Sequence, residues 1–189
     1  MTLALLAALL VQTPSCLPLD VDRSVVRWRG TKFFGLGSHE GTVRLKAGEL
    51  CIQGGSVASG WFVADMTTIE VTDIPANDPV PRNRLRNHLL SQDFFDVSRH
   101  PEARFRIGSI TLQNGRLFQV VGALTIRDST RAVRFYARGW TVNTDRVEGT
   151  ARFAIDRHDY GVSYVGSTIK DDLVDDEFWL EIDIKARRL

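Results

Sequence analysis

The sequence predicts an all-β protein, an antiparallel eight-stranded barrel crossed by one short helix. Two observations carry this prediction. Nearly every segment after the first residues alternates apolar and polar side chains with a period of two, and short turns rich in Gly, Asn and Asp separate the segments. One segment alone has helical spacing. With 189 residues, 43% hydrophobic and 25% charged, the chain has the composition of one globular domain.

The alternating segments give eight or nine strands joined mostly by tight turns. Ala47-Gly48, Gly54-Gly55 and Asn114-Gly115 are the clearest turn signals, because Gly and Asn accept the positive φ angles of a hairpin. An antiparallel meander of this length must close or form a sandwich to protect its edges. The expected strands cover residues 24–32, 41–46, 49–53, 57–71, 103–113, 116–126, 132–142, 146–156 and 177–186.

The helix is predicted over residues 82–92. Leu85, Leu89 and Gln92 recur there at i, i+4 and i+7, which places them on one face of a helix. Pro79 and Pro81 precede the segment, and Pro101 prevents its continuation. We therefore expect a helical crossover between two parts of the sheet.

Residues 1–16 have the character of an export leader, which leaves residues 17–189 for the barrel. The apolar run at 3–11 is too short for a membrane-spanning helix, which needs about 20 residues, but suits a secretory signal peptide. We expect an exported, periplasmic protein. Cys16 follows the small Ser15, as in a bacterial lipoprotein leader, so lipidation of Cys16 would anchor the protein to a membrane. A disulfide with Cys51, or removal of Cys16 with the leader, are the alternatives.

The charge balance argues against nucleic acid as a partner. The formal net charge is +1, whereas nucleic-acid-binding domains carry a strong basic excess. Only four of the 24 basic residues are lysines, and the arginines are scattered along the predicted strands. We attribute the arginines to overall composition.

Residues 85–105 hold the densest group of chemically active side chains, with His88, His100, Asp93 and Asp96 within thirteen residues. None of the four histidines of the chain shows the spacing of a known metal or protease motif, and no nucleophile motif is present. We expect the aspartates to cap backbone N–H groups and His88 to make a structural hydrogen bond. The sequence predicts no catalytic residue, no metal and no cofactor.

One face of the strands is strongly apolar and aromatic. Gly60, Gly122 and Gly139 share strand faces with these residues, and their missing side chains would leave room for a slender ligand. The alternative is a solid core. We expect the following residues to point into the barrel and line a binding site: Val26, Trp28, Phe62, Phe105, Phe118, Leu124, Phe135, Phe153, Phe178 and Leu180.

Four blocks of the sequence resemble the YceI-like family of exported bacterial proteins. The resemblance covers the chain beyond the leader and implies a lipocalin-like barrel that binds a polyisoprenoid. Asp128-Ser129 departs mildly from the family, which usually has Gly near that turn. The blocks are Leu19-Asp20-Val21-Asp22 with Ser24–Trp28, Asn87–Val97 with Pro101 and Phe105, Val121–Ile126 with Val133, and Phe153–Arg157 with Tyr160-Gly161-Val162.

We therefore expect a binding or carrier protein for an isoprenoid or other long-chain lipid, and not an enzyme. Arg82 and Arg86 lie one helical turn apart and would meet an anionic head group if the helix covers the barrel mouth. Two other classes stay open: a small-molecule isomerase or hydrolase on the same barrel, and a lipid-anchored interaction module with a filled core. Pairing into a homodimer is also left open.

Overall fold

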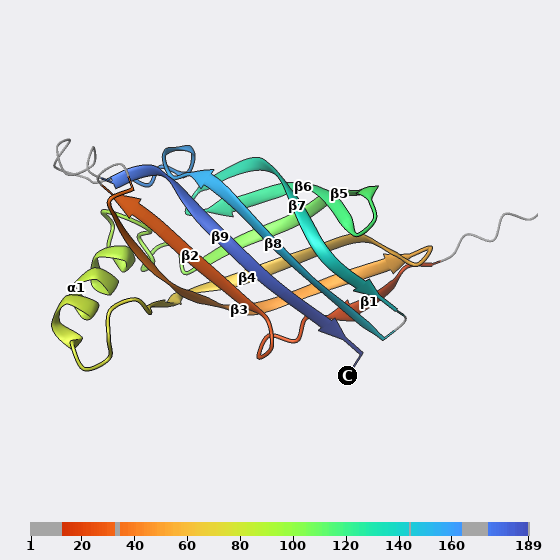
Figure 1. Cartoon of the computed structure of the whole chain (residues 1–189), viewed down its shortest axis with the longest axis horizontal. Coiled ribbons are helices and arrows are strands. Elements are labelled where there is room, and N and C mark those ends of the chain that lie inside the picture. Colours follow the sequence, from red (N-terminus) through yellow and green to blue (C-terminus); the bar gives the residue numbers. More distant parts are fainter. Residues whose placement is uncertain (1–12, 33–34, 144, 164–173, 189) are drawn as a thin grey trace, which may run out of the picture.

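Eight antiparallel strands, β2 to β9, close into a barrel, and a short ninth strand, β1, lies beside β3. The computed structural model describes residues 13–32, 35–143, 145–163 and 174–188. Figure 1 shows an elongated barrel with the single α-helix at one end and β1 near the other. In chain order the elements are β1 Ser15–Pro18, β2 Val25–Lys32, β3 Gly37–Gln53, β4 Ser56–Val71, α1 Pro79–Leu90, β5 Glu102–Asn114, β6 Leu117–Ile126, β7 Ser129–Val142, β8 Arg146–Asp156, the 3-10 turn η1 His158–Tyr160 and β9 Val174–Arg187.

Strand β3 closes the barrel because it pairs on both sides. Along one edge it pairs with β4 from Gln53↔Ser56 to Gly41↔Val71. Along the other edge its first half pairs with β2, and its last residues pair with β1. The chain after β1 also reaches β9 through the bridge Leu19↔Ala186. β1 thus pairs with the part of β3 that β2 does not reach, so the last residues of β3 also have a partner strand on this edge.

The turn predicted at Ala47-Gly48 is wrong. Residues 41–46 and 49–53 belong to one strand of 17 residues, and the pairing with β4 shifts register between Leu45 and Ala47. A β-bulge here kinks the strand without ending it. Gly48 has its own packing reason, because a Cβ there would lie 2.8 Å from the Trp61 carbonyl oxygen and 2.9 Å from the Phe62 ring.

The helix exists as predicted, but it begins three residues earlier, at Pro79. Both prolines lie within its first turn, where the missing N–H group needs no partner. Leu89 is buried against β3 and β4 in a small apolar cluster beneath the helix. The other buried members of this cluster are Val43, Met66, Ile69, Val71 and Val97.

Gly60 and Gly122 do not leave open space in the barrel, which corrects the sequence-based expectation. A Cβ on Gly60 would lie 2.6 Å from Leu50 Cδ2, and a Cβ on Gly122 would lie 2.4 Å from Cζ of Phe105. Gly139 has a positive φ of 67° and is exposed. These glycines permit close packing or a local turn, and the room inside the barrel comes from other residues.

Arg157 joins the η1 turn to the start of β9. The side chain is 2% exposed and donates hydrogen bonds to the carbonyl oxygens of Val162, Val174 and Asp175 at 3.1 to 3.3 Å. Tyr160 lies in the same turn, 1% exposed. Its hydroxyl is buried and has no hydrogen-bond partner among the described residues. Burial raises the pKa of Tyr160 to about 12.

Tyr160→Phe is expected to stabilise the protein at neutral pH by about 1 kcal/mol, because it removes a buried hydroxyl that has no partner. The raised pKa means that the folded state favours the neutral phenol. The neutral phenol of Tyr160 therefore makes its full contribution to the free energy of unfolding below the ordinary tyrosine pKa of about 10. This contribution is lost as pH rises toward 12. Urea unfolding between pH 7 and 11.5 measures both effects. A variant that is less stable than the wild type at pH 7 would show that the hydroxyl is bonded.

Candidate functional site

An apolar cavity of about 130 Å³ lies inside the barrel. All eight strands from β2 to β9 contribute to its wall, and Phe95, which follows α1, contributes from the helical crossover. A single water molecule needs only about 10 to 15 Å³ by this kind of measure, so the space is a true cavity and not a packing defect. The barrel is therefore hollow and not a solid core.

The structure places nine of the ten predicted lining residues at the cavity wall. They come from seven strands and all point inward because of the two-residue alternation. Their contact with a ligand stays a prediction. The nine are Val26, Trp28, Phe62, Phe105, Leu124, Phe135, Phe153, Phe178 and Leu180.

Phe118 is the exception, and its placement in the lining is wrong. Hydrogen-bonded partners form a row around the barrel: Val43, Val26, Ile182, Ala151, Ala137 and then Phe118. The first five line the cavity, but Phe118 does not. Because strands tilt against the axis of a barrel, a row of partners climbs along it, and by β6 this row has passed beyond the cavity.

Four of the lining phenylalanines form a continuous aromatic wall across β4, β5, β7 and β8. The ring centroids of Phe135 and Phe153 are 4.2 Å apart and the rings are nearly parallel, while Phe105 lies 5.6 Å from Phe135 and 6.3 Å from Phe62. Such contacts keep large rings in fixed positions. Aromatic rings in contact with one another thus form this side of the cavity wall.

The remaining wall consists mainly of aliphatic residues that the sequence analysis did not select. The same alternation would have found them, but small residues such as alanine carry little apolar signal. Ala137 and Ala151 are cross-strand partners in β7 and β8, so two short side chains meet at the wall. The additional lining residues are Val43, Leu45, Ala64, Met66, Ile69, Phe95, Ala103, Arg104, Ile107, Val120, Ile126, Ala137, Gly149, Thr150, Ala151, Ile182 and Ile184.

Trp28 supplies a buried polar group at the cavity wall. Its indole ring packs over Gly41, where a Cβ would lie 2.6 Å from Cζ2 of the ring. The indole Nε1 is buried and has no hydrogen-bond acceptor among the described residues. An unsatisfied buried donor costs free energy, so an oxygen atom of a ligand at this position would gain by accepting its hydrogen.

Among the described residues, those that line the cavity include no Asp, Glu, His, Cys or Lys. General acid–base chemistry needs such groups within hydrogen-bond reach of a substrate, and nucleophilic catalysis needs an activated side chain. The wall of the cavity is thus almost entirely apolar.

The histidines and aspartates of residues 85–105 do not converge on a site. Asp96 is 2% exposed, and its carboxylate accepts hydrogen bonds from Arg99 Nε at 2.5 Å and from the Ser98 hydroxyl. The Arg99 hydrogen bond lowers the pKa of Asp96 below its ordinary value. In the part of the chain described, the side-chain carboxylate of neither Asp93 nor Asp96 accepts a backbone N–H, so the predicted capping role is wrong for both; the Asp96 backbone carbonyl accepts the N–H groups of Arg99 and His100. The His88 ring packs against Phe94, with centroids 5.6 Å apart.

Arg82 and Arg86 hold α1 against β4. Arg82 pairs with Glu70 at 3.3 Å, and Arg86 donates to the carbonyl oxygens of Ile69 at 2.8 Å and Thr67 at 3.1 Å. Neither residue lines the cavity. These contacts give both arginines a part in seating the helix, and binding of an anionic head group stays a prediction.

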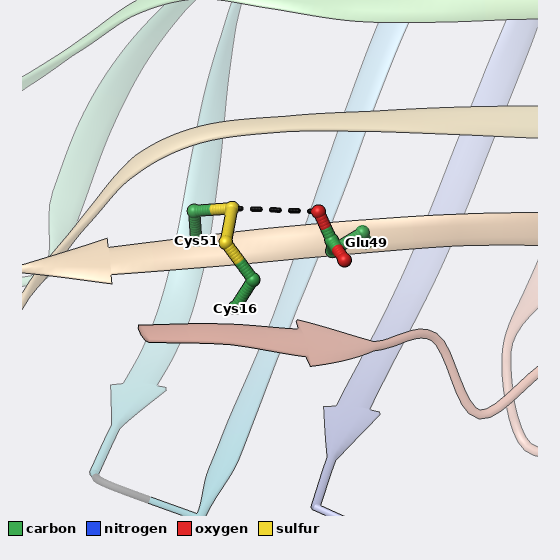
Figure 2. A group of neighbouring side chains, drawn as sticks. All are labelled: Cys16, Glu49 and Cys51. Carbon is green, nitrogen blue, oxygen red and sulfur yellow. Dashed lines mark hydrogen bonds between the residues drawn. A yellow bond between two sulfur atoms is a disulfide. The ribbon is translucent and has the colours of Figure 1, made fainter. Parts of the chain in front are cut away.

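Cys16 and Cys51 are joined by a disulfide that links β1 to β3 (Figure 2). The two cysteines are direct partners in the strand register. The Cys51 sulfur also lies 3.6 Å from Glu49 Oε1, as Figure 2 shows. These three residues are the one group of close potential metal ligands among the described residues, but both sulfurs are bonded to each other. A sulfur in this disulfide cannot also carry a lipid, so lipidation of Cys16 would require a different covalent form.

The predicted boundary between residues 16 and 17 falls inside β1, which begins at Ser15. Most of the predicted leader, residues 1–12, lies outside the described residues, so export and cleavage stay predictions. No described helix has the length and apolar character needed to cross a membrane.

Fold and cavity together define a class, the closed antiparallel β-barrels with an apolar interior. A family model described as the YceI-like domain matches residues 18–186. Because this match covers most of its length, the chain belongs to the YceI-like family, as its sequence blocks indicate. Among curated proteins no sequence matches the chain.

Solved structures of other proteins share the fold. BcnA of Burkholderia cenocepacia has a TM-score of 0.69 at 18% identity, with 89% of this chain and 99% of BcnA covered. A polyisoprenoid binding domain from Saccharophagus degradans, implicated in plant cell wall breakdown, has a TM-score of 0.62 at 11% identity, covering 94% of this chain and 100% of the domain. The Campylobacter jejuni YCEI protein reaches 0.56 at 18% identity, covering 71% and 75%.

Cys51→Ser is expected to lower the free energy of unfolding by about 2 to 4 kcal/mol, because it opens a cross-link between residues 35 apart. Urea unfolding measures this. Cys16→Ser and the double variant should lose the same amount, since all three remove one bond. Two results together would contradict the disulfide and favour lipidation of Cys16: a Cys51→Ser variant as stable as the wild type, and a Cys51 thiol in the wild type that alkylates without prior reduction.

Proposed function

We propose that this protein binds a long-chain, isoprenoid-type lipid inside its barrel and carries or sequesters it. The observation that carries the proposal is the cavity, whose wall comes from every strand of the barrel and holds almost no polar atoms. Burial of apolar surface contributes about 0.8 kcal/mol per CH₂ group, so affinity grows with the length of chain enclosed. A slender hydrocarbon suits such an interior.

The YceI-like family and the Saccharophagus degradans neighbour support the same ligand class, since that domain is described as polyisoprenoid binding. The alternative of an enzyme on the same barrel lacks support in the lining, which has no Asp, Glu, His, Cys or Lys among the described residues. The alternative of an interaction module with a filled core fits less well, because the barrel contains open space.

We also propose that the protein works outside the cytoplasm, in the periplasm. The apolar run at residues 3–11 supports export, and the Cys16–Cys51 disulfide is typical of an oxidising compartment. In this form the protein is free of a lipid on Cys16. A lipid anchor and a homodimer stay open expectations, as does a diphosphate head group at Arg82 and Arg86.

Ala151→Phe tests whether the cavity is the binding site. Ala151 lines the cavity opposite Ala137, so a phenyl ring there would occupy the space that a ligand needs. We expect binding of farnesol, a short isoprenoid alcohol, to fall at least tenfold. Titration followed by native mass spectrometry measures the bound fraction.

The matched control is Ala132→Phe, which adds the same ring to the exposed outer side of the neighbouring strand β7. This variant should bind farnesol like the wild type. Circular dichroism confirms that both variants are folded. Unchanged binding by a folded Ala151→Phe variant would place the ligand elsewhere and overturn the proposal for the cavity.

Trp28→Phe tests whether the indole N–H selects an oxygen-bearing ligand. The substitution keeps an aromatic ring at the wall but removes the buried donor. We expect affinity for farnesol to fall about two- to tenfold, which is the net worth of one hydrogen bond. Affinity for farnesene, a hydrocarbon of similar length without the hydroxyl, should stay the same. An equal loss for both ligands would show that Trp28 acts through packing alone.

A further inference from the structure

The outer face of β5, β6 and β7 is strongly basic. Residues 102–142, which span these strands, contain seven arginines and two acidic residues, Glu102 and Asp128. This segment therefore carries a formal charge of +5, whereas the whole chain carries +1, which leaves −4 for the rest. Acidic and basic residues are thus segregated in the fold, although the arginines are scattered along the sequence.

Arg106, Arg134 and Arg138 form the core of this surface, which we name the basic face. All three are exposed and alternate with inward residues such as Phe105 and Phe135, so they point outward. None of them makes an ion pair within the described part of the chain. The β6 partners opposite them are uncharged, because Arg106 pairs with Ala123, Arg134 with Val121 and Arg138 with Leu117.

Two exposed aromatic side chains lie in the same surface. Trp61 on β4 is the register partner of Arg106 and is 42% exposed, and Tyr136 lies between Arg134 and Arg138 and is 49% exposed. Trp and Tyr are the residues that favour the boundary between lipid head groups and hydrocarbon.

The other side of the barrel is built differently. There the outer side chains neutralise one another: Arg27 of β2 pairs with Glu181 at 3.2 Å and with Asp183 at 2.6 Å, both on β9. Arg152 of β8 lies over the Trp179 ring at 5.0 Å. The side of the barrel formed by β5 to β7, with seven arginines and two acidic residues, offers few such pairs.

We propose that the basic face docks the protein onto an anionic phospholipid surface, with Trp61 and Tyr136 at the level of the head groups. Each arginine near such a surface contributes about 1 kcal/mol of attraction, and the three arginines point outward from the same side of the barrel. A nucleic acid fits less well, because the chain as a whole is nearly neutral and the face is small. This surface lies outside the cavity, so the proposal fails or holds independently of the lipid cargo.

The test is flotation of the full chain with vesicles. Wild-type protein should bind vesicles of phosphatidylcholine with 30% phosphatidylglycerol, should not bind pure phosphatidylcholine, and should be released by 0.5 M salt, which screens exposed charges. The triple variant Arg106→Gln, Arg134→Gln and Arg138→Gln should bind the anionic vesicles roughly 100-fold more weakly.

The matched control removes three exposed arginines from other surfaces, as Arg23→Gln, Arg29→Gln and Arg188→Gln, and loses the same net charge. This control should bind vesicles within about threefold of the wild type, and both triple variants should still bind farnesol. No vesicle binding by the wild type, equal losses in both triple variants, or tighter binding to single-stranded RNA than to anionic vesicles would each overturn the proposal.

Trp61→Phe provides a second readout. Insertion of Trp61 among head groups should shift the tryptophan emission of the wild type to shorter wavelength on vesicle addition. The shift should be lost in Trp61→Phe. A full shift in that variant would place the contact elsewhere.

Discussion

Closure of the sheet through β3 is the constraint on which the rest of the structure depends. β3 pairs with β4 along one edge. Along its other edge it pairs first with β2 and then with β1. A backbone group left unpaired at this edge would cost stability and invite pairing with another chain. The disulfide between Cys16 and Cys51 lies where β1 takes over from β2, and therefore fastens the shortest strand at the edge that it protects.

Once the ring is closed, the alternation of side chains decides what the interior holds. Every second residue of eight strands points inward, and a barrel of this size has a choice between filling its centre and leaving a cavity. Aromatic rings on one side stack on one another, as Phe135 and Phe153 do at 4.2 Å, and so hold their places at the wall. The next inward pair along the same two strands, Ala137 and Ala151, is too short to reach across. The cavity follows from this uneven distribution of side-chain size.

The fold could be predicted from the sequence because its signals are local. Two-residue alternation found the strands, and Asn114-Gly115 marked a hairpin. The turn at Ala47-Gly48 could not be excluded, since a β-bulge and a tight turn both use a small residue. The site was harder. Whether a side chain points inward follows from the alternation along each strand, and this alternation correctly placed nine of the ten predicted residues at the cavity wall. The position of Phe118 along the barrel axis depends on strand tilt, and no local pattern records that tilt.

The arginines of β5 and β7 likewise show no pattern along the chain, because their grouping depends on how the strands pair and not on local sequence. Arg106 and Arg134 are 28 positions apart and meet on one surface only because β6 pairs with both of their strands. Their segregation from the acidic side chains also has a functional logic. A lining that exposes almost no polar atoms distinguishes ligands mainly by apolar area, which many lipids share. If the protein docks on an anionic membrane as proposed, that membrane largely decides which lipids the barrel collects, because the exposed charges of the outer face select the surface.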